Sequence, residues 1–184
     1  MTKLHVSKFD VAERQLLLAI RLFFKEEDPV SIHTLSEASS QILYDLRDTY
    51  GGNSMFKNSA FIKEEHKKEW YKKIAKSKNF FKHAEKDPNS THEFNVTINH
   101  FSLIDAVNMY ETIKKKWVPE TLIYTCWFVS KYPNLLLQKS NYESAYKQNL
   151  VPHLTSDKKQ MLLILDQIKT GELVLPNSED TMYL

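Results

Sequence analysis

A short polar sequence near the middle of the chain contains the side-chain types that metal-free RNA cleavage uses. Lys78 and Asn79 are followed, after three residues, by His83. A neutral imidazole can accept the proton of a ribose 2′-hydroxyl, and a fixed cation can stabilise the charge that develops on the scissile phosphate. An amide can hold either group in position. These three residues are therefore candidates for a catalytic site in which His83 is the acid/base residue.

The residues around this candidate site are strongly basic, although the whole chain is nearly neutral. The 184 residues include 25 basic and 23 acidic side chains, a balance that excludes a polycation built to coat nucleic acid. Residues 57–86 nevertheless hold ten lysines against four glutamates, with aromatic residues interleaved. Such a segment can attract phosphates and stack bases. We predict RNA contacts at Lys67, Lys72, Lys73, Lys76 and Lys82; the alternative is that these lysines only solvate an exposed helix.

The six residues from Lys78 to His83 resemble the motif of the HEPN superfamily of small helical-bundle proteins. That motif has an arginine, a polar residue that is often asparagine, three variable residues and a histidine, near the start of a helix. The resemblance implies a homodimer in which two copies of the motif face each other, and RNA cleavage without a metal ion. Asn79 would position the reacting groups. Residues 28–35 and 79–88 also look like a widespread group of uncharacterised small bacterial proteins.

This sequence departs from the HEPN motif at its first position, where Lys78 replaces arginine. Lysine keeps the charge but lacks the planar fork that binds a phosphate through two hydrogen bonds. The substitution favours the alternative of a non-catalytic helical module that binds a protein or a nucleotide. In that alternative His83 is a structural residue, hydrogen-bonded for example to Asp87. His33 either approaches the same cleft or fills a partly buried position.

Other residue types suggest no second catalytic centre. His66 with Glu65 and Glu69, and Asp105 with Glu111 on a different helix, could be imagined as a carboxylate-rich metal site in a bundle, but no Glu-x-x-His spacing repeats on two helices. With three glycines the chain cannot build a glycine-rich phosphate loop or a dinucleotide fingerprint. The single cysteine, Cys126, forms no internal disulfide and is expected to be a small core residue. We therefore predict no metal and no other cofactor.

Apolar residues recur every three or four positions along most of the chain, which predicts helices. A first helix is expected near residues 9–24, and a second begins at Pro29 after the cap Asp28 and stops at Gly51. The composition of residues 122–129 favours a strand, whereas the flanking residues favour a helix, and the aromatic cluster Trp117, Tyr124, Trp127, Phe128 and Tyr132 should pack in the core. Further helices are expected near residues 61–75, 98–116, 135–146 and 157–170, with a turn or helix at 78–84.

The sum of these elements is an all-α, single-domain helical bundle of about five to seven helices in residues 1–171. Residues 172–184 carry three acids and no base, so we expect a loose acidic C-terminal tail. A chain of this length buries about 70% of its unfolded surface, enough for one hydrophobic core. No apolar run reaches the length of a signal peptide or a membrane span, so a cytoplasmic protein without membrane contact is expected.

Overall fold

The computed structural model describes residues 3–57, 64–85, 87–133 and 155–174 and confirms the all-α bundle. The described residues form six helices and no strand. In chain order the helices are α1 Lys8–Phe24, α2 Pro29–Tyr50, α3 Glu64–Phe80, α4 Ile98–Lys114, α5 Pro119–Lys131 and α7 Lys158–Thr170.

Side-chain caps explain where several helices begin. Before α1, Ser7 and Asp10 form a reciprocal capping box, with backbone-to-side-chain distances of 2.9 and 3.0 Å. Asp28 accepts a hydrogen bond from the backbone N–H of Ser31 at 2.8 Å, and Pro29 is the first residue of α2, as the sequence predicts. Asp157 caps α7 in the same way. These local contacts set the helix starts before any tertiary packing is considered.

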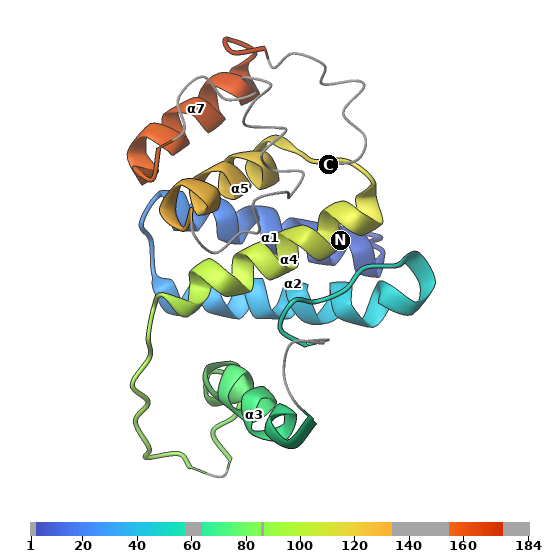
Figure 1. Ribbon diagram of the computed structural model, residues 1–184, viewed down its shortest axis with the longest axis vertical. Coiled ribbons are helices and arrows are strands. Elements are labelled where there is room, and N and C mark those ends of the chain that lie inside the picture. Colours follow the sequence, from blue (N-terminus) through green and yellow to red (C-terminus); the bar gives the residue numbers. More distant parts are fainter. Residues whose placement is uncertain (1–2, 58–63, 86, 134–154, 175–184) are drawn as a thin grey trace.

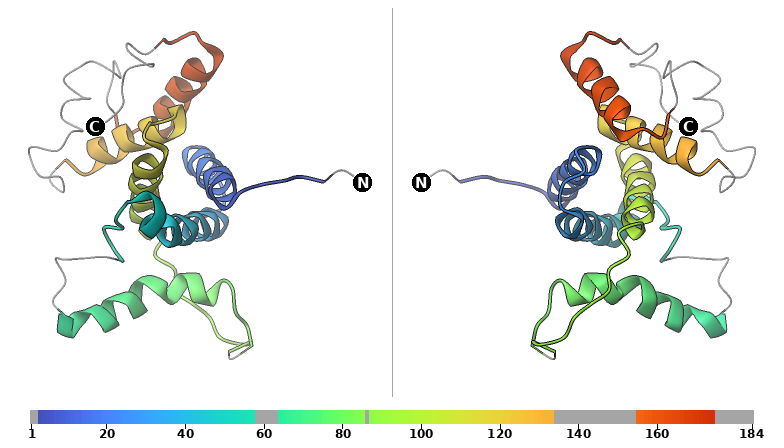
Figure 2. Two further views of the ribbon diagram at one scale, coloured as in Figure 1. Left: turned by 90° about the vertical axis from the view of Figure 1, so that its right-hand side faces the viewer. Right: turned by 90° about the vertical axis from the view of Figure 1, so that its left-hand side faces the viewer.

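The core lies between α1, α2, α4 and α5, and α7 covers α5 on the outside (Figure 1). α1 and α2 are joined by four residues and lie side by side, and α4 packs on α2. α3 is separate from this arrangement. It lies on the side of α2 away from α5 and α7, and Figure 2 shows it apart from the other helices in both views. The described helices thus form one packed group with α3 attached to it.

The segment for which composition and context disagreed is a helix. α5 buries Tyr124 and Trp127 among the residues of α1 and α4. The ring centre of Trp127 is 4.7 Å from that of Phe23, and its indole N–H donates to the backbone oxygen of Ser156 at 3.0 Å. Phe128 is also buried, while Trp117 and Tyr132 are half-buried. Packing against neighbouring helices therefore overrides the strand preference of aromatic and β-branched residues.

Other boundaries differ from the expected ones, or fall where the structure gives no description. Of the residues expected as two pieces near 61–75 and 78–84, Glu64–Phe80 form the single helix α3, residues 81–84 follow its end, and residues 61–63 lie outside the described residues. The helix expected at 135–146 and most of the acidic tail, residues 175–184, lie outside the described residues. Among the described helices, none is both long and apolar enough to cross a membrane.

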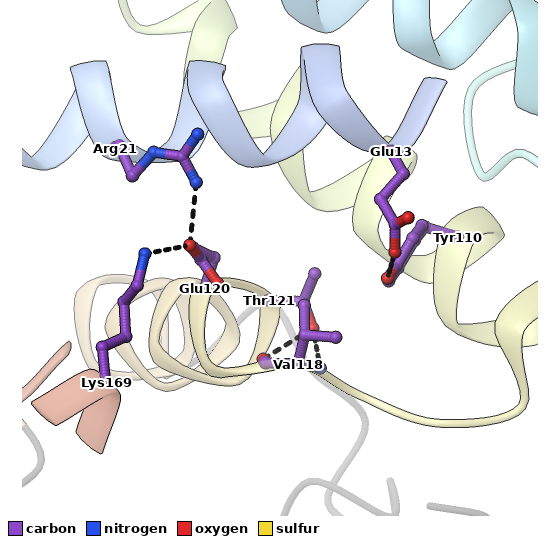
Figure 3. A network of polar contacts seen from close by, with 7 residues as sticks. All are labelled: Glu13, Arg21, Tyr110, Val118, Glu120, Thr121 and Lys169. Atoms are coloured by element: carbon purple, nitrogen blue, oxygen red, sulfur yellow. Dashed lines mark hydrogen bonds and ion pairs between the residues drawn. The ribbon is translucent and has the colours of Figure 1, made fainter. Parts of the chain in front are cut away.

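A buried carboxylate joins three helices (Figure 3), two of which, α5 and α7, lie on the opposite side of α2 from α3 (Figure 1). Glu120 of α5 is 5% exposed and lies 2.8 Å from Arg21 of α1 and 2.9 Å from Lys169 of α7. Burial alone would raise the pKa of Glu120, but hydrogen bonds from Lys169, from its own backbone and from Arg21 lower that pKa below its usual 4.5. Glu120 therefore stabilises the bundle as an anion.

We predict that Glu120→Ala lowers the free energy of unfolding by about 2 kcal/mol at pH 7, because Arg21 and Lys169 lose their carboxylate partner. The loss stays moderate because both cations are partly solvated. Since the folded pKa of Glu120 is depressed, its contribution is present at neutral pH and is lost as pH falls through that pKa. Urea unfolding from pH 7 down to pH 3 should show the difference from wild type shrinking.

The control for this experiment is Glu69→Gln, which removes one partner of an exposed ion pair with Lys73. This change should cost less than about 0.5 kcal/mol. Equal losses in the two variants would contradict the role assigned to Glu120.

Candidate functional site

The predicted catalytic residues lie at the C-terminal end of α3 and beyond it. Lys78 is half-buried in the last turn, where its ammonium donates to Oε1 of Gln41 on α2 at 2.8 Å. Asn79 is exposed, and its backbone oxygen accepts from the backbone N–H of His83 at 3.1 Å. His83 itself is exposed, three residues past the end of the helix. The motif thus ends a helix, with its cation bound to α2 and its imidazole in solvent.

The lysines predicted to contact RNA divide between solvent and ion pairs. Lys72 and Lys76 are exposed and, with Lys68, follow one face of α3 at intervals of four residues. Lys82 is exposed just after the helix. Two others have acidic partners. Lys67 is half-buried and pairs with Glu64, and Lys73 lies 3.1 Å from Glu69. We call Lys68, Lys72 and Lys76 the lysine row.

The opposite face of α3 turns toward the bundle. Tyr71 donates its hydroxyl to the backbone oxygen of Lys57, and Ser77 and His92 are joined at 2.8 Å. Together with the hydrogen bond from Lys78 to Gln41, these polar contacts attach α3 to the rest of the molecule. Lys78 therefore has a structural partner, whereas His83, for which the non-catalytic alternative expected a paired and occluded position, is exposed.

His33 is fully buried beneath the end of α3. Its Nδ1 lies 2.9 Å from Oδ1 of Asn99, whose amide donates to the backbone oxygen of Pro29 at 2.9 Å. Because that amide oxygen can only accept, Nδ1 of His33 carries the proton. The rings of Phe81 and Phe94 lie 5.6 and 5.1 Å from the imidazole. His33 therefore packs against the candidate motif through Phe81 and is not exposed beside it.

A cavity that sequence reasoning missed lies between α2, α3 and α4. Its volume is about 420 Å³, and a second cavity of about 370 Å³ adjoins it. Glu37, Lys57 and Ile74 line both cavities, and Lys78 lines the second. Glu37 and Lys57 come from separate parts of the sequence, and no local spacing pattern connects them. Only the packing of α3 on the bundle brings them together.

Asp105 is a buried and Lys57 a half-buried charged group of this cavity. Burial lowers the pKa of Lys57, and Lys78 adds to this effect, whereas the nearby carboxylates of Glu37 and Asp105 oppose it. The Lys57 ammonium donates to Oγ of Ser40 at 3.2 Å. Burial also raises the pKa of Asp105, which accepts from the hydroxyl of Ser54 and the backbone N–H of Met55, both at 2.6 Å. Asp105 thereby anchors the segment that carries Lys57.

The residues considered as metal ligands are in different environments. His66 and Glu65 lie 3.5 Å apart on the exposed surface of α3. Glu111 is on α4, where burial raises its pKa to about 7 and the hydroxyl of Thr121 opposes the shift. Burial also raises the pKa of the half-buried Cys126 to about 12. Within the described part of the chain, no three histidine, cysteine, aspartate or glutamate side chains form a metal-binding group.

Comparison of the chain with family models, with curated proteins and with solved structures gives no match. The resemblance to the HEPN superfamily therefore depends on residues 78–83 and on the pattern of amphipathic helices that precedes them.

The buried state of His33 predicts a pH effect on stability. Burial is the main cause that lowers its pKa below the usual 6.5, with Lys78 and His92 adding to it and Glu37 and Asn99 opposing it. The unfolded chain therefore binds a proton at His33 more readily, so the folded state loses stability as pH falls below 6.5. We expect His33→Leu to lower the free energy of unfolding at pH 8. Between pH 7 and pH 5, however, the free energy of unfolding of this variant should fall less than that of wild type.

Urea unfolding across this pH range measures the effect as the difference between wild type and variant. His100, whose pKa burial lowers to about 4, contributes a similar trend to both proteins and cancels in that difference. Thr34→Val on the same helix changes no titratable group, so its difference from wild type should not vary with pH. A pH-independent difference for His33→Leu would contradict the assigned environment.

Proposed function

We propose that this protein is an RNA-binding helical module that contacts its ligand with the exposed face of α3. The observation that carries this proposal is the lysine row, three exposed cations on one face of a helix that lies outside the packed core. Four residues advance a helix by about 6 Å, so the row extends over about 12 Å. Lys82 continues the positive charge past the helix end.

Electrostatics supports binding along this face. The lysine row and Lys82 are solvated. The glutamates of α3 have partners of their own: Glu64 pairs with Lys67, Glu69 pairs with Lys73, and Glu65 lies 3.5 Å from His66. Lysines of the row that contact a phosphate backbone release the counterions condensed on the RNA, which favours binding. Because the contacts are to phosphates, the proposed binding is strongly salt-dependent and only weakly dependent on base sequence.

The arrangement of the motif supports binding more than cleavage. In a cleavage site the imidazole acts on the ribose 2′-hydroxyl and the cation on the adjacent scissile phosphate, so the two groups must lie close together. The ammonium of Lys78 is instead engaged with Gln41 in a half-buried position.

A second candidate function is nevertheless favoured by the exposure of His83 beside Lys82. This candidate is metal-independent RNA cleavage with His83 as acid/base, in the homodimer that the HEPN resemblance implies.

Charge reversal tests the binding proposal. Lys72→Glu combined with Lys76→Glu should weaken binding of a single-stranded RNA by at least about tenfold and lower the slope of log affinity against log salt by about 1.4, since each lost phosphate contact contributes about 0.7. Fluorescence anisotropy of a labelled RNA between low and moderate salt measures both quantities.

The matched control combines Lys8→Glu and Lys159→Glu, which make the same change in net charge at exposed positions of α1 and α7. Glutamates near helix N-termini do not disfavour folding. If the two double variants weaken RNA binding equally, the binding depends on net charge and the assignment to α3 is wrong.

Cleavage is tested separately by incubating a mixed-sequence RNA with wild type and with His83→Ala in excess EDTA. Cleavage by wild type alone, with 2′,3′-cyclic phosphate ends, would support the second candidate. We expect instead that both proteins bind RNA in low salt and leave it intact. Equal cleavage by both proteins would exclude His83 as the acid/base residue.

A further inference from the structure

The cavity between α2, α3 and α4 combines an apolar wall with charged groups of both signs. Phe56, Ile98 and Phe101 form the wall together with Ile74 of α3. All four are half-buried, and the cavity at about 420 Å³ has the size of a small-molecule site. The apolar wall would bury the hydrocarbon part of a ligand, and the polar end of the cavity decides which head group fits.

The Lys57 ammonium supplies hydrogen-bond donors at this polar end. An ammonium has three N–H groups, and the described residues provide one acceptor at 3.2 Å, the hydroxyl of Ser40. The ring of Tyr44 lies 5.1 Å from the same nitrogen. The Lys57 ammonium therefore has N–H groups left to donate to an acceptor on a ligand. A carboxylate is the acceptor that matches a cation beside a hydroxyl.

Glu37 supplies the complementary acceptor. One of its oxygens accepts from the hydroxyl of Ser102 at 2.7 Å, and the other accepts no hydrogen bond from the described residues. Glu37 lines both cavities, and its carboxylate opposes the lowering of the pKa of both Lys57 and Lys78 by burial. A ligand ammonium would find an acceptor here. Asp105 is different, because both of its oxygens are already occupied by Ser54 and Met55.

The charges that line the two cavities are balanced. Lys57 and Lys78 are opposed by the carboxylates of Glu37 and Asp105. Lys73, at the cavity edge, is paired with Glu69. A ligand with a net charge would disturb this balance in a poorly solvated place, whereas a zwitterion would not.

We propose that this cavity binds a free α-amino acid with a hydrophobic side chain. The carboxylate of the ligand lies against Lys57 and Ser40, its ammonium against Glu37, and its side chain against Phe56, Ile74 and Phe101. This inference is independent of the RNA-binding proposal, because it uses the inner face of α3 and not the lysine row.

Isothermal titration calorimetry of the full chain with L-leucine, L-phenylalanine and L-tryptophan tests the proposal. The tightest of the three is then compared with two analogues that keep its side chain, the carboxylic acid without the amino group and the amine without the carboxylate. We expect both analogues to bind at least about tenfold more weakly than the amino acid. No binding of any amino acid at concentrations up to about 10 mM, or equal binding of an analogue, would overturn the proposal.

Two substitutions identify the head-group contacts. Lys57→Met should weaken the amino acid by about tenfold or more but not the amine analogue, and Glu37→Gln should weaken the amino acid but not the carboxylic acid analogue. Lys68→Met, on the outer face of α3, is the control and should leave affinity unchanged. The proposal would be overturned if neither substitution weakened the amino acid more than it weakened the corresponding analogue. If Lys57→Met fails to fold, the near-isosteric Glu37→Gln and the analogue comparison decide the outcome.

Discussion

The polarity of α3 is the constraint on which the rest of the structure depends. A helix that carries so many lysines and glutamates cannot enter the hydrophobic core, because burying unpaired charge costs far more than burying its few apolar residues contributes. α3 therefore lies outside the bundle. The face of α3 that turns toward the bundle is attached to it by hydrogen bonds such as those from Lys78 to Gln41 and from Tyr71 to the backbone of Lys57. Both the exposed lysine row and the cavity beneath the helix result from this placement.

The cavity in turn depends on α2 and on the segment that follows it. α2 contributes Glu37 and Ser40, and the turn after Gly51 brings Lys57 back across the same helix. Gly51 has a φ of +81°, a conformation that glycine adopts without the steric cost met by other residues. Asp105 on α4 then binds the turn through Ser54 and Met55. Tyr71 of α3 binds the backbone oxygen of Lys57, and Ser40 of α2 accepts from its ammonium, so the residue lies between the two helices.

The two proposed functions use opposite faces of one helix. The outer face is polar, solvated and suited to phosphates, and the inner face is partly apolar and closes a cavity against the bundle. On the other side of the molecule, Glu120 joins α1, α5 and α7 and stabilises the core without contact to α3. Stability and the candidate functions therefore depend on different sets of charged residues.

The sequence by itself determined the all-α class and the positions of most described helices, because apolar spacing and caps such as Asp28 and Asp157 act over a few residues. It also identified Lys72, Lys76 and Lys82 as basic residues near the candidate motif, and these are exposed. Only the tertiary structure decided that α3 is one helix and that Lys78 faces Gln41. The cavity depended on tertiary structure altogether, since Glu37, Lys57 and Asp105 are distant in the chain and their meeting depends on how whole helices pack.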